Sequence, residues 1–174
     1  FAWHSSSYAY TSLQQEQAAY QTFDQLIFVS RSVERGFWQR FVSLPPRPGC
    51  VIHNPFPPTL GSRHSRVRPF AGMTCLSMGR LTNQKRFDLL LLAQHRLCAE
   101  GMPFNLILLG EGEEHSALTA LIAELGLEKR VLMPGFVDDS EEWFTCADLY
   151  VSTSVAEGYP MVVGEALLHG LPVL

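Results

Sequence analysis

The feature that most constrains this chain is a regular alternation of short apolar runs and helical patterns after residue 70. The apolar runs, at 74–78, 105–109, 131–133 and 149–152, lack the polar–apolar alternation of a half-exposed strand. Helical patterns lie between or after them, at 85–100, 114–125, 140–146 and 161–168, and another apolar run opens at Leu171. Strands that are apolar on both faces and are joined by helices form parallel sheets covered on both sides. With right-handed crossovers, this segment is predicted to be a Rossmann-like α/β domain.

The part of the chain before residue 70 is less regular. Two apolar runs, 26–29 and 50–53, are typical of short strands, and residues 11–22 and 31–41 have helical composition, with Ser30 or Ser32 as cap of the second helix. Residues 45–69 are rich in proline, which indicates a linker because proline removes amide donors and disfavours helix before it. We therefore predict two parts, residues 1–70 and residues 71–174.

Composition excludes several classes of protein. Hydrophobic residues make up 47% of the chain and charged residues 17%, which is enough for a packed core and argues against disorder. The net charge of −4 argues against a protein that coats nucleic acid, and no apolar run is as long as a membrane span. The four cysteines are widely spaced, which predicts reduced thiols rather than disulfides or a zinc site.

The two ends of the sequence add an expectation about its context. Residues 1–10 have neither the basic end nor the apolar centre of a signal peptide, which favours an intracellular protein. The chain does not begin with Met, and it stops in what reads as the first half of a strand. We therefore expect these 174 residues to be part of a longer protein.

Ligands of open parallel sheets bind beyond the carboxyl ends of the strands, so the residues there are the candidate site. The first such segment is Gly79-Arg80-Leu81, followed by Lys85. A glycine allows close backbone approach, while arginine and lysine offer a guanidinium fork and a mobile charge for phosphate oxygens. The alternative is a strand-end glycine followed by solvated basic residues, and for this segment alone we favour it.

The second segment, Gly110-Glu111-Gly112, is only part of the GxGxxG pattern of dinucleotide-binding turns, because His115 replaces the third glycine. A tight strand-to-helix turn explains it equally well.

The third segment runs from Ser152 to Pro160 and leads into the helix that carries Glu165. Pro160 suits a position just before or at the first helical residue, where free backbone N–H groups can bind an anion. A carboxylate such as Glu157 or Glu165 can accept hydrogen bonds from two neighbouring hydroxyls of a ribose or hexose. Together the three segments suit a sugar linked to a nucleoside diphosphate. Alternatively, Glu157 favourably caps the helix and Glu165 is a surface carboxylate.

These motifs resemble the donor domain of a retaining glycosyltransferase of family 4, which has the GT-B fold. The resemblance runs in order over residues 73–174, through GRL with Lys85, GEG, VLMPGFV at 131–137, Ala147-Asp148, EGYP with Glu165-Ala166, and GLPV at 170–173. The spacing of Glu157 and Glu165 is its most specific element. Residues 3–5, 28–30 and 51–55 are similar to the acceptor domain of the same family. The resemblance implies that residues 1–70 are the end of the acceptor domain plus a linker, and that 71–174 are a donor domain incomplete at its C-terminus.

The resemblance also implies roles for individual residues. Arg80 and Lys85 would hold the donor diphosphate, Glu157 the donor sugar, and Glu165 the ribose, while His4 would reach the sugar and the acceptor. The remaining donor contacts would come from Gly79, Gly110, Gly112, Phe136, Val137, Gly158, Tyr159, Pro160, Met161 and Val162. Asp138-Asp139 is not a DxD motif, so no metal and no other cofactor is implied. The implied reaction moves a sugar from a nucleotide-diphosphate-sugar to a glycan or lipid-linked acceptor with retained configuration.

Other functions stay open from the sequence. A fragment could bind nucleotide-sugars without catalysis, or the same fold could hydrolyse or epimerise them. Arg63, Arg66 and Arg68 suit a solvated linker, or else contact with anionic lipid by an enzyme at the inner face of the cytoplasmic membrane. Among the histidines, His53 is predicted to end a strand, and His64, His95, His115 and His169 to lie on the surface.

Overall fold

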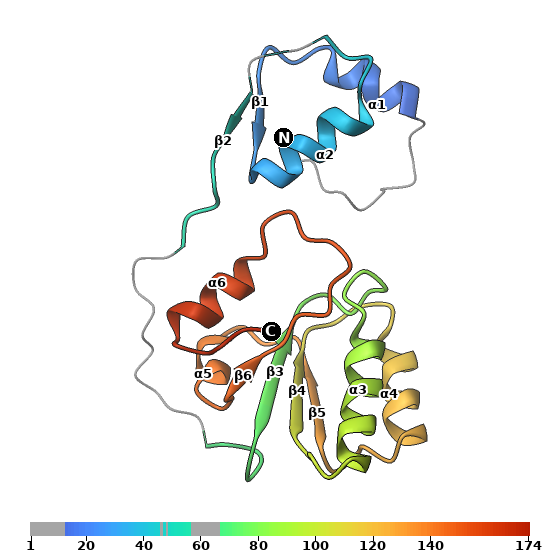
Figure 1. Cartoon of the computed structure of the whole chain (residues 1–174), viewed down its shortest axis with the longest axis vertical. Helices are drawn as coiled ribbons and strands as arrows, with labels where there is room; N and C mark the ends of the chain where they lie inside the picture. The colour runs from blue at the N-terminus through green and yellow to red at the C-terminus, as the bar shows by residue number, and fades with distance from the viewer. Residues whose placement is uncertain (1–12, 46, 48, 57–66) are drawn as a thin grey trace. The chain divides into compact units, whose positions relative to one another are not determined.

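The computed structural model describes residues 13–45, 47, 49–56 and 67–174, and its chain divides into two compact units (Figure 1). The first unit contains the described residues up to Pro55 together with Ala156–Pro160. The second contains those from Phe56 to Val155 together with Met161–Leu174.

The first unit is a small α/β assembly. Its elements in chain order are α1 (Leu13–Tyr20), β1 (Leu26–Phe28), α2 (Arg31–Arg40) and β2 (Gly49–Val51). The two strands pair in parallel, with Phe28 opposite Val51. Aromatic rings dominate the core beside them, where Phe37 and Phe41 are fully buried and pack edge to face against Tyr20 or tilted against each other. Ser30 caps α2 as predicted, because its Oγ accepts a hydrogen bond of 3.2 Å from the Val33 N–H.

The second unit contains the predicted parallel sheet. Its strands are β3 (Thr74–Met78), β4 (Asn105–Leu109), β5 (Val131–Gly135) and β6 (Leu149–Tyr150), in the spatial order β5-β4-β3-β6. All of their pairings are parallel, and Val173 forms a further parallel bridge with Tyr150 at the β6 edge. The chain therefore moves outward from β3 in one direction to β5 and then in the other direction to β6.

Helices cover both faces of this sheet (Figure 1). The first pair, α3 (Phe87–Ala99) and α4 (His115–Glu124), lies on one face, and α5 (Glu141–Phe144) and α6 (Met161–Leu168) lie on the other. Alternate residues of β4 contribute to two separate hydrophobic cores. Leu106 and Leu108 pack under α3 and α4, and Ile107 and Leu109 pack on the opposite side of the sheet. This double burial explains why the strand has a continuous apolar sequence.

One predicted boundary shifts in a way that affects the site. The helix expected over 85–100 begins only at Phe87, because Arg86 has a left-handed backbone with φ of +51°. Lys85 consequently lies in the loop between β3 and α3, and its N–H donates to the Thr82 carbonyl at 3.0 Å. Its side chain is therefore presented from a turn at the carboxyl end of β3 rather than from a helical surface.

Candidate functional site

The loop that leaves β3 brings a predicted glycine and a predicted lysine together. A Cβ atom on Gly79, whose φ is +156°, would lie 2.8 Å from Cε and 3.2 Å from Nζ of Lys85. The lysine side chain therefore lies directly against the glycine backbone, where an added methyl group would displace it. Arg80, the next residue, is exposed. The two cations thus emerge from one short loop at the end of the central strand.

Gly110 and Gly112, in the loop after β4, have a structural explanation in the same region. A Cβ at Gly110 would overlap the Gly79 carbonyl oxygen, and a Cβ at Gly112 would overlap that of Leu81. The two loops run backbone to backbone, because the Gly79 N–H donates to the Leu109 carbonyl at 3.0 Å and the Leu81 N–H to the Glu111 carbonyl at 2.8 Å. Close loop packing therefore accounts for both glycines without a ligand, and donor contact by them stays a prediction.

The loop after β6 is fastened to the loop that carries Lys85. Thr153 Oγ1 donates to the Lys85 carbonyl at 2.8 Å, and the Val155 N–H donates to the Gln84 carbonyl at 2.9 Å. These bonds join the carboxyl ends of β3 and β6, which are neighbours at the point where the strand order reverses. Open α/β sheets bind their ligands at this point.

Helix α6 starts directly after Pro160 and carries Glu165 in its second turn. The Glu165 side chain is half-buried, and burial raises the pKa of its carboxyl group; His169 acts to lower that pKa, and Glu141 to raise it. The half-buried Glu165 therefore does not fit the alternative interpretation, in which it is a surface carboxylate. Met161 and Val162, at the start of the helix, are half-buried as well, and Val162 packs against the core beneath α6.

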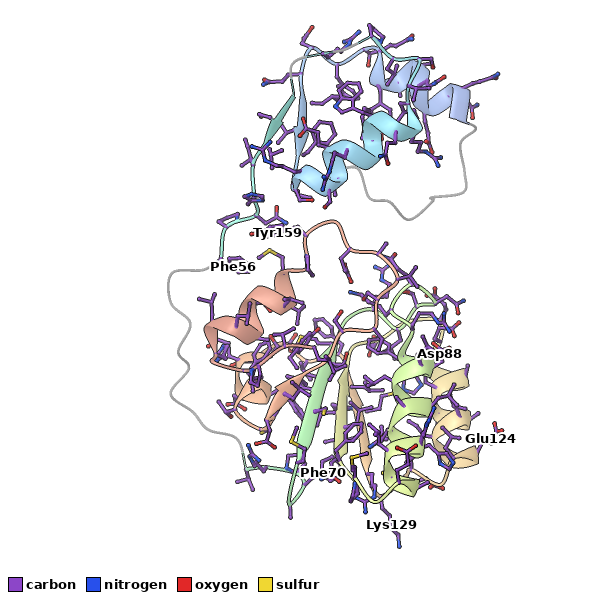
Figure 2. All side chains as sticks on the ribbon, in the orientation of Figure 1. Phe56, Phe70, Asp88, Glu124, Lys129 and Tyr159 are labelled. Atoms are coloured by element: carbon purple, nitrogen blue, oxygen red, sulfur yellow. The ribbon has the colours of Figure 1, made fainter. Side chains whose placement is uncertain are left out.

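The residues from Glu157 to Pro160 belong by their contacts to the first compact unit. Ser30 Oγ donates to the Gly158 carbonyl at 2.8 Å, and the Tyr159 ring stacks on His53 with ring centroids 5.2 Å apart (Tyr159 is labelled in Figure 2). His53, expected at a strand end, also hydrogen-bonds to the Val29 carbonyl through Nδ1. Glu157 itself is half-buried.

Phe136 and Val137 follow the last residue of β5 and differ in burial. Gly135 turns the chain with φ of +86°, after which 68% of Phe136 is exposed while Val137 packs against the core under α5 and α6. An exposed aromatic ring at a strand end has a free face for another flat group. His4 lies outside the described residues.

Comparison with known proteins assigns the chain to a family. A family model described as glycosyl transferases group 1 matches residues 72–174, which is more than half of the chain. The chain belongs to this family. The match covers the α/β unit with the β3, β4 and β6 loops, and the solved structures that the chain resembles are glycosyltransferases with the GT-B fold.

Individual similar proteins match different shares of the chain. An uncharacterized glycosyltransferase of Haemophilus influenzae is 29% identical over 88% of this chain and 42% of its own length. N-acetylgalactosamine-N,N'-diacetylbacillosaminyl-diphospho-undecaprenol 4-alpha-N-acetylgalactosaminyltransferase of Campylobacter jejuni is 38% identical over 53% of this chain and 24% of its own length. The crystal structure of Anabaena Alr3699/HepE in complex with UDP and glucose superposes with a TM-score of 0.71 and 25% identity, over 96% of this chain and 49% of that one. The chain therefore spans less than half the length of these relatives.

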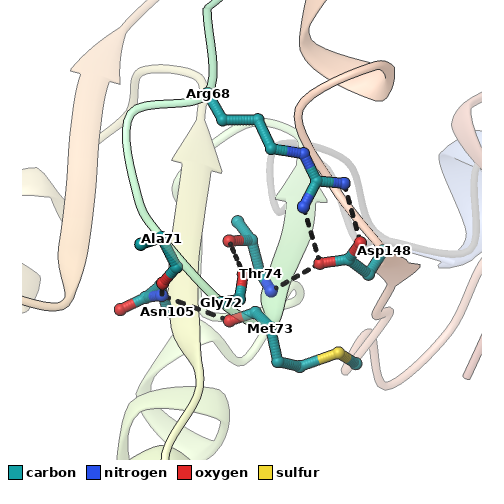
Figure 3. Close-up of polar contacts among 7 residues, drawn as sticks. All are labelled: Arg68, Ala71, Gly72, Met73, Thr74, Asn105 and Asp148. Carbon is teal, nitrogen blue, oxygen red and sulfur yellow. Dashed lines mark hydrogen bonds and ion pairs between the residues drawn. The ribbon is translucent and has the colours of Figure 1, made fainter.

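A second polar cluster in the group 1 domain lies at the amino ends of the strands, away from these loops (Figure 3). Arg68 donates to both carboxylate oxygens of Asp148, at 2.7 and 3.2 Å, and the Thr74 N–H donates to the same carboxylate at 2.9 Å. The Asn105 amide donates to the Ala71 and Met73 carbonyls beside it. This cluster fastens the segment before β3 to the start of the sheet. Arg68 is exposed, as expected of a linker residue, and is in addition paired with Asp148. Arg63 and Arg66 lie outside the described residues.

A large hollow in this domain has none of the predicted donor residues in its lining. It has a volume of about 530 Å³ and is lined mainly by apolar side chains of β3, α3 and β6, including Cys75, Leu97 and Leu149. Burial raises the pKa of the Cys75 thiol to about 11, which keeps it protonated at neutral pH. A hollow without charged side chains does not suit a diphosphate.

The described residues offer neither a metal site nor a membrane span. Within the described ranges, no cluster of three or more His, Cys, Asp or Glu side chains is arranged to hold a metal ion. No helix among the same residues is long and apolar enough to cross a bilayer.

Sequence reasoning missed one residue near Glu165. His169 was expected on the surface, yet its ring is half-buried and stacks on Phe144 of α5 with centroids 4.8 Å apart. His169 comes one residue after the end of α6, and its position in the sequence gives no signal of the contact with Phe144.

Proposed function

We propose that this chain holds the donor half of a glycosyltransferase that moves a sugar from a nucleoside-diphosphate-sugar to an acceptor. The observation that carries the proposal is the meeting of the β3 and β6 loops, with Lys85 and Arg80 on one and the approach to α6 on the other. Two cations beside a switch point of a parallel sheet are suited to a diphosphate. Membership of the glycosyl transferases group 1 family supports the same ligand class.

The described residues suggest which side chain would contact each part of such a donor. Lys85 and Arg80 would neutralise the charge that develops on the leaving diphosphate, which lowers the barrier to breaking the sugar–phosphate bond. The half-buried Glu165 carboxylate would accept hydrogen bonds from the two ribose hydroxyls. Phe136 would lie along the base, and Glu157 would contact the sugar. The similar Anabaena structure is a complex with UDP, which makes uracil the first base to test.

We also propose that the transfer needs no metal and retains the configuration at the sugar carbon. The sequence has Asp138-Asp139 rather than a DxD motif, and the cations of the β3 loop can take the place of a metal at the diphosphate. The acceptor is proposed to be a glycan or lipid-linked sugar at the inner face of the membrane, since the name of the Campylobacter relative specifies a diphospho-undecaprenol acceptor.

The test is sugar transfer by the full-length protein, measured with UDP- and GDP-sugars and a diphospho-polyprenol-linked acceptor. Lys85→Ala and Glu157→Ala should each reduce turnover about 100-fold or more. Lys129→Ala and Glu124→Ala are matched controls on exposed residues (Figure 2) and should leave turnover unchanged. Normal turnover in the first two variants would contradict the assignment.

The same assay separates the two other functions. Release of free sugar in the absence of acceptor would favour a nucleotide-sugar hydrolase. Binding of the nucleotide-sugar without any turnover would favour a non-catalytic binding module.

A further inference from the structure

Helix α6 has a glycine near its centre, where most short helices have a better helix-forming residue. Gly164 is the fourth residue of the helix, which runs from Met161 to Leu168. Glycine in a helix interior is less favourable than alanine, because it loses more backbone freedom on folding. The backbone of Gly164 is helical, so no left-handed conformation requires a glycine there. The reason for the glycine must therefore be what packs against the helix.

The ring of Phe56 packs directly against this glycine (Phe56 is labelled in Figure 2). A Cβ atom on Gly164 would overlap the ring, and the ring atom nearest to it is Cζ, at the tip. Both residues belong to the second compact unit, of which Phe56 is the first residue. A residue without a side chain is what allows an aromatic ring to approach a helix backbone this closely.

The Phe56 ring contacts α6 on the side that faces away from the hydrophobic core. Val162 and Ala166, one helical turn apart, pack into the core beneath the helix, and Ala166 is fully buried. Gly164 is two residues from each of them, which at about 100° per residue places it on the opposite side of the helix. The helix is therefore held between the core and the Phe56 ring rather than by the core alone.

The sequence around Phe56 suits a fixed support. Phe56 is half-buried although it belongs to the proline-rich linker, and prolines stand on both sides of it, at positions 55 and 57. A proline restricts the backbone of the residue before it to extended conformations, which limits where the Phe56 ring can lie. Val67, an apolar residue later in the same linker, is by contrast 88% exposed.

We propose that Phe56 is a positioning residue for the donor site, because it supports α6 at Gly164 and thereby fixes where Glu165 lies. This inference rests on the proposed function, in which the Glu165 carboxylate accepts the ribose hydroxyls. A helix of eight residues has little stability by itself and takes its orientation from packing. Glu165 follows Gly164 directly, so a rotation of the helix moves its carboxylate. The alternative is that Phe56 only stabilises the fold.

The test is the nucleotide affinity of the folded, full-length protein, measured by titration calorimetry with UDP, GDP, ADP and TDP. The nucleotide that the wild-type protein binds most tightly is then used for the variants, below the melting temperature of each. Phe56→Ala should weaken binding about tenfold, a loss within the range of coupling energies between residues in contact. Val67→Ala is the control in the same linker and should bind like wild type. A purely stabilising role would lower the melting temperature without changing this affinity.

A second substitution tests the contact itself. Gly164→Ala should weaken binding by a similar factor, because the added methyl group displaces the ring. In the double variant Phe56→Ala/Gly164→Ala the methyl group meets no ring, so the loss should not exceed that of Phe56→Ala alone. Phe56→Tyr extends the ring at Cζ, toward the helix, and should weaken binding as well. It keeps the ring and therefore tests the contact even if Phe56→Ala does not fold.

The possible results separate this inference from the proposed function. Wild-type affinity in the Phe56 and Gly164 single variants would overturn the inference, whether or not their melting temperatures fall. Additive losses in the double variant would overturn it too. Absence of binding of all four nucleotides by the wild-type protein would instead contradict the proposed function.

Discussion

At the scale of single residues, the glycines of the β3 and β4 loops are constrained by backbone contact. Gly110 combines a φ of +131° with a direct approach to the Gly79 carbonyl, so a side chain there is both strained and overlapping. Gly126, just after α4, has a φ of +66° and open space around it. Comparing alanine substitutions at Gly110 and Gly126 therefore separates the free-energy cost of backbone strain from that of steric overlap.

Gly110→Ala should therefore destabilise the second unit more than Gly126→Ala. The open position should lose about 1–2 kcal/mol from left-handed strain alone, and Gly110→Ala about 2 kcal/mol more because the loops must separate. Urea denaturation of both variants measures the difference. Equal losses would mean that the loops do not pack backbone to backbone.

The ion pair of Arg68 and Asp148 predicts an effect of acid. The hydrogen bonds from Arg68, more than any other factor, hold the pKa of Asp148 below its ordinary value of 3.8. A carboxyl group with a lowered pKa in the folded state stabilises the fold above its unfolded pKa, and this contribution disappears as pH falls through the folded pKa.

Asp148→Asn should consequently be less stable than wild type at pH 7, and the difference should shrink below about pH 4. Asp138→Asn, on an exposed aspartate, is the control and should follow wild type throughout. Thermal unfolding at a series of pH values provides the comparison. A constant difference down to about pH 2 would show that the Asp148 contacts are not ionic in character.

At the scale of elements, α2 illustrates how one cap defines where a helix begins. Ser30 has an extended backbone, and its hydroxyl accepts the Val33 N–H that the first turn leaves free. Ser30→Ala should destabilise α2 by about 1 kcal/mol, while Ser30→Thr, which keeps the hydroxyl, should retain most of that stability. Amide hydrogen exchange over residues 31–40 reports the change locally. Unaltered exchange in Ser30→Ala would mean that the cap contributes nothing to the helix.

At the scale of the whole molecule, the question is whether this chain, which spans less than half of its relatives' length, retains a working donor site. The β3 loop, α6 and Glu165 all lie within the second compact unit. A ligand that binds only the folded state raises its stability by about 2.7 kcal/mol at 100 times its Kd.

One of UDP, GDP, ADP and TDP should therefore raise the melting temperature of the 174-residue chain. The shift should be lost in Glu165→Ala and kept in Glu124→Ala, a solvent-exposed glutamate on α4. A cooperative transition that none of the four nucleotides moves would indicate that the donor site needs parts of the protein beyond these residues.

The sequence alone was sufficient for the element order and the parallel sheet. Strands that are apolar throughout, such as 105–109, and glycine stops after helices are local signals that follow from burial on both faces and from backbone geometry. The family could also be predicted from the sequence, because ordered motifs such as GRL and EGYP lie at strand ends. Ser30 was one of the two residues predicted from local sequence preferences to cap the helix.

Only the tertiary structure determined the contacts between residues far apart in the chain. Arg68 pairs with Asp148 across 80 positions, Gly110 approaches Gly79, and the His169 ring stacks on Phe144. None of these pairings has a periodic or positional signature, since each arises when separate strands and helices pack into one sheet and its two cores. The physical reason is that periodicity reports which face of an element is buried, whereas the partner that buries it is chosen by the packing of the whole domain.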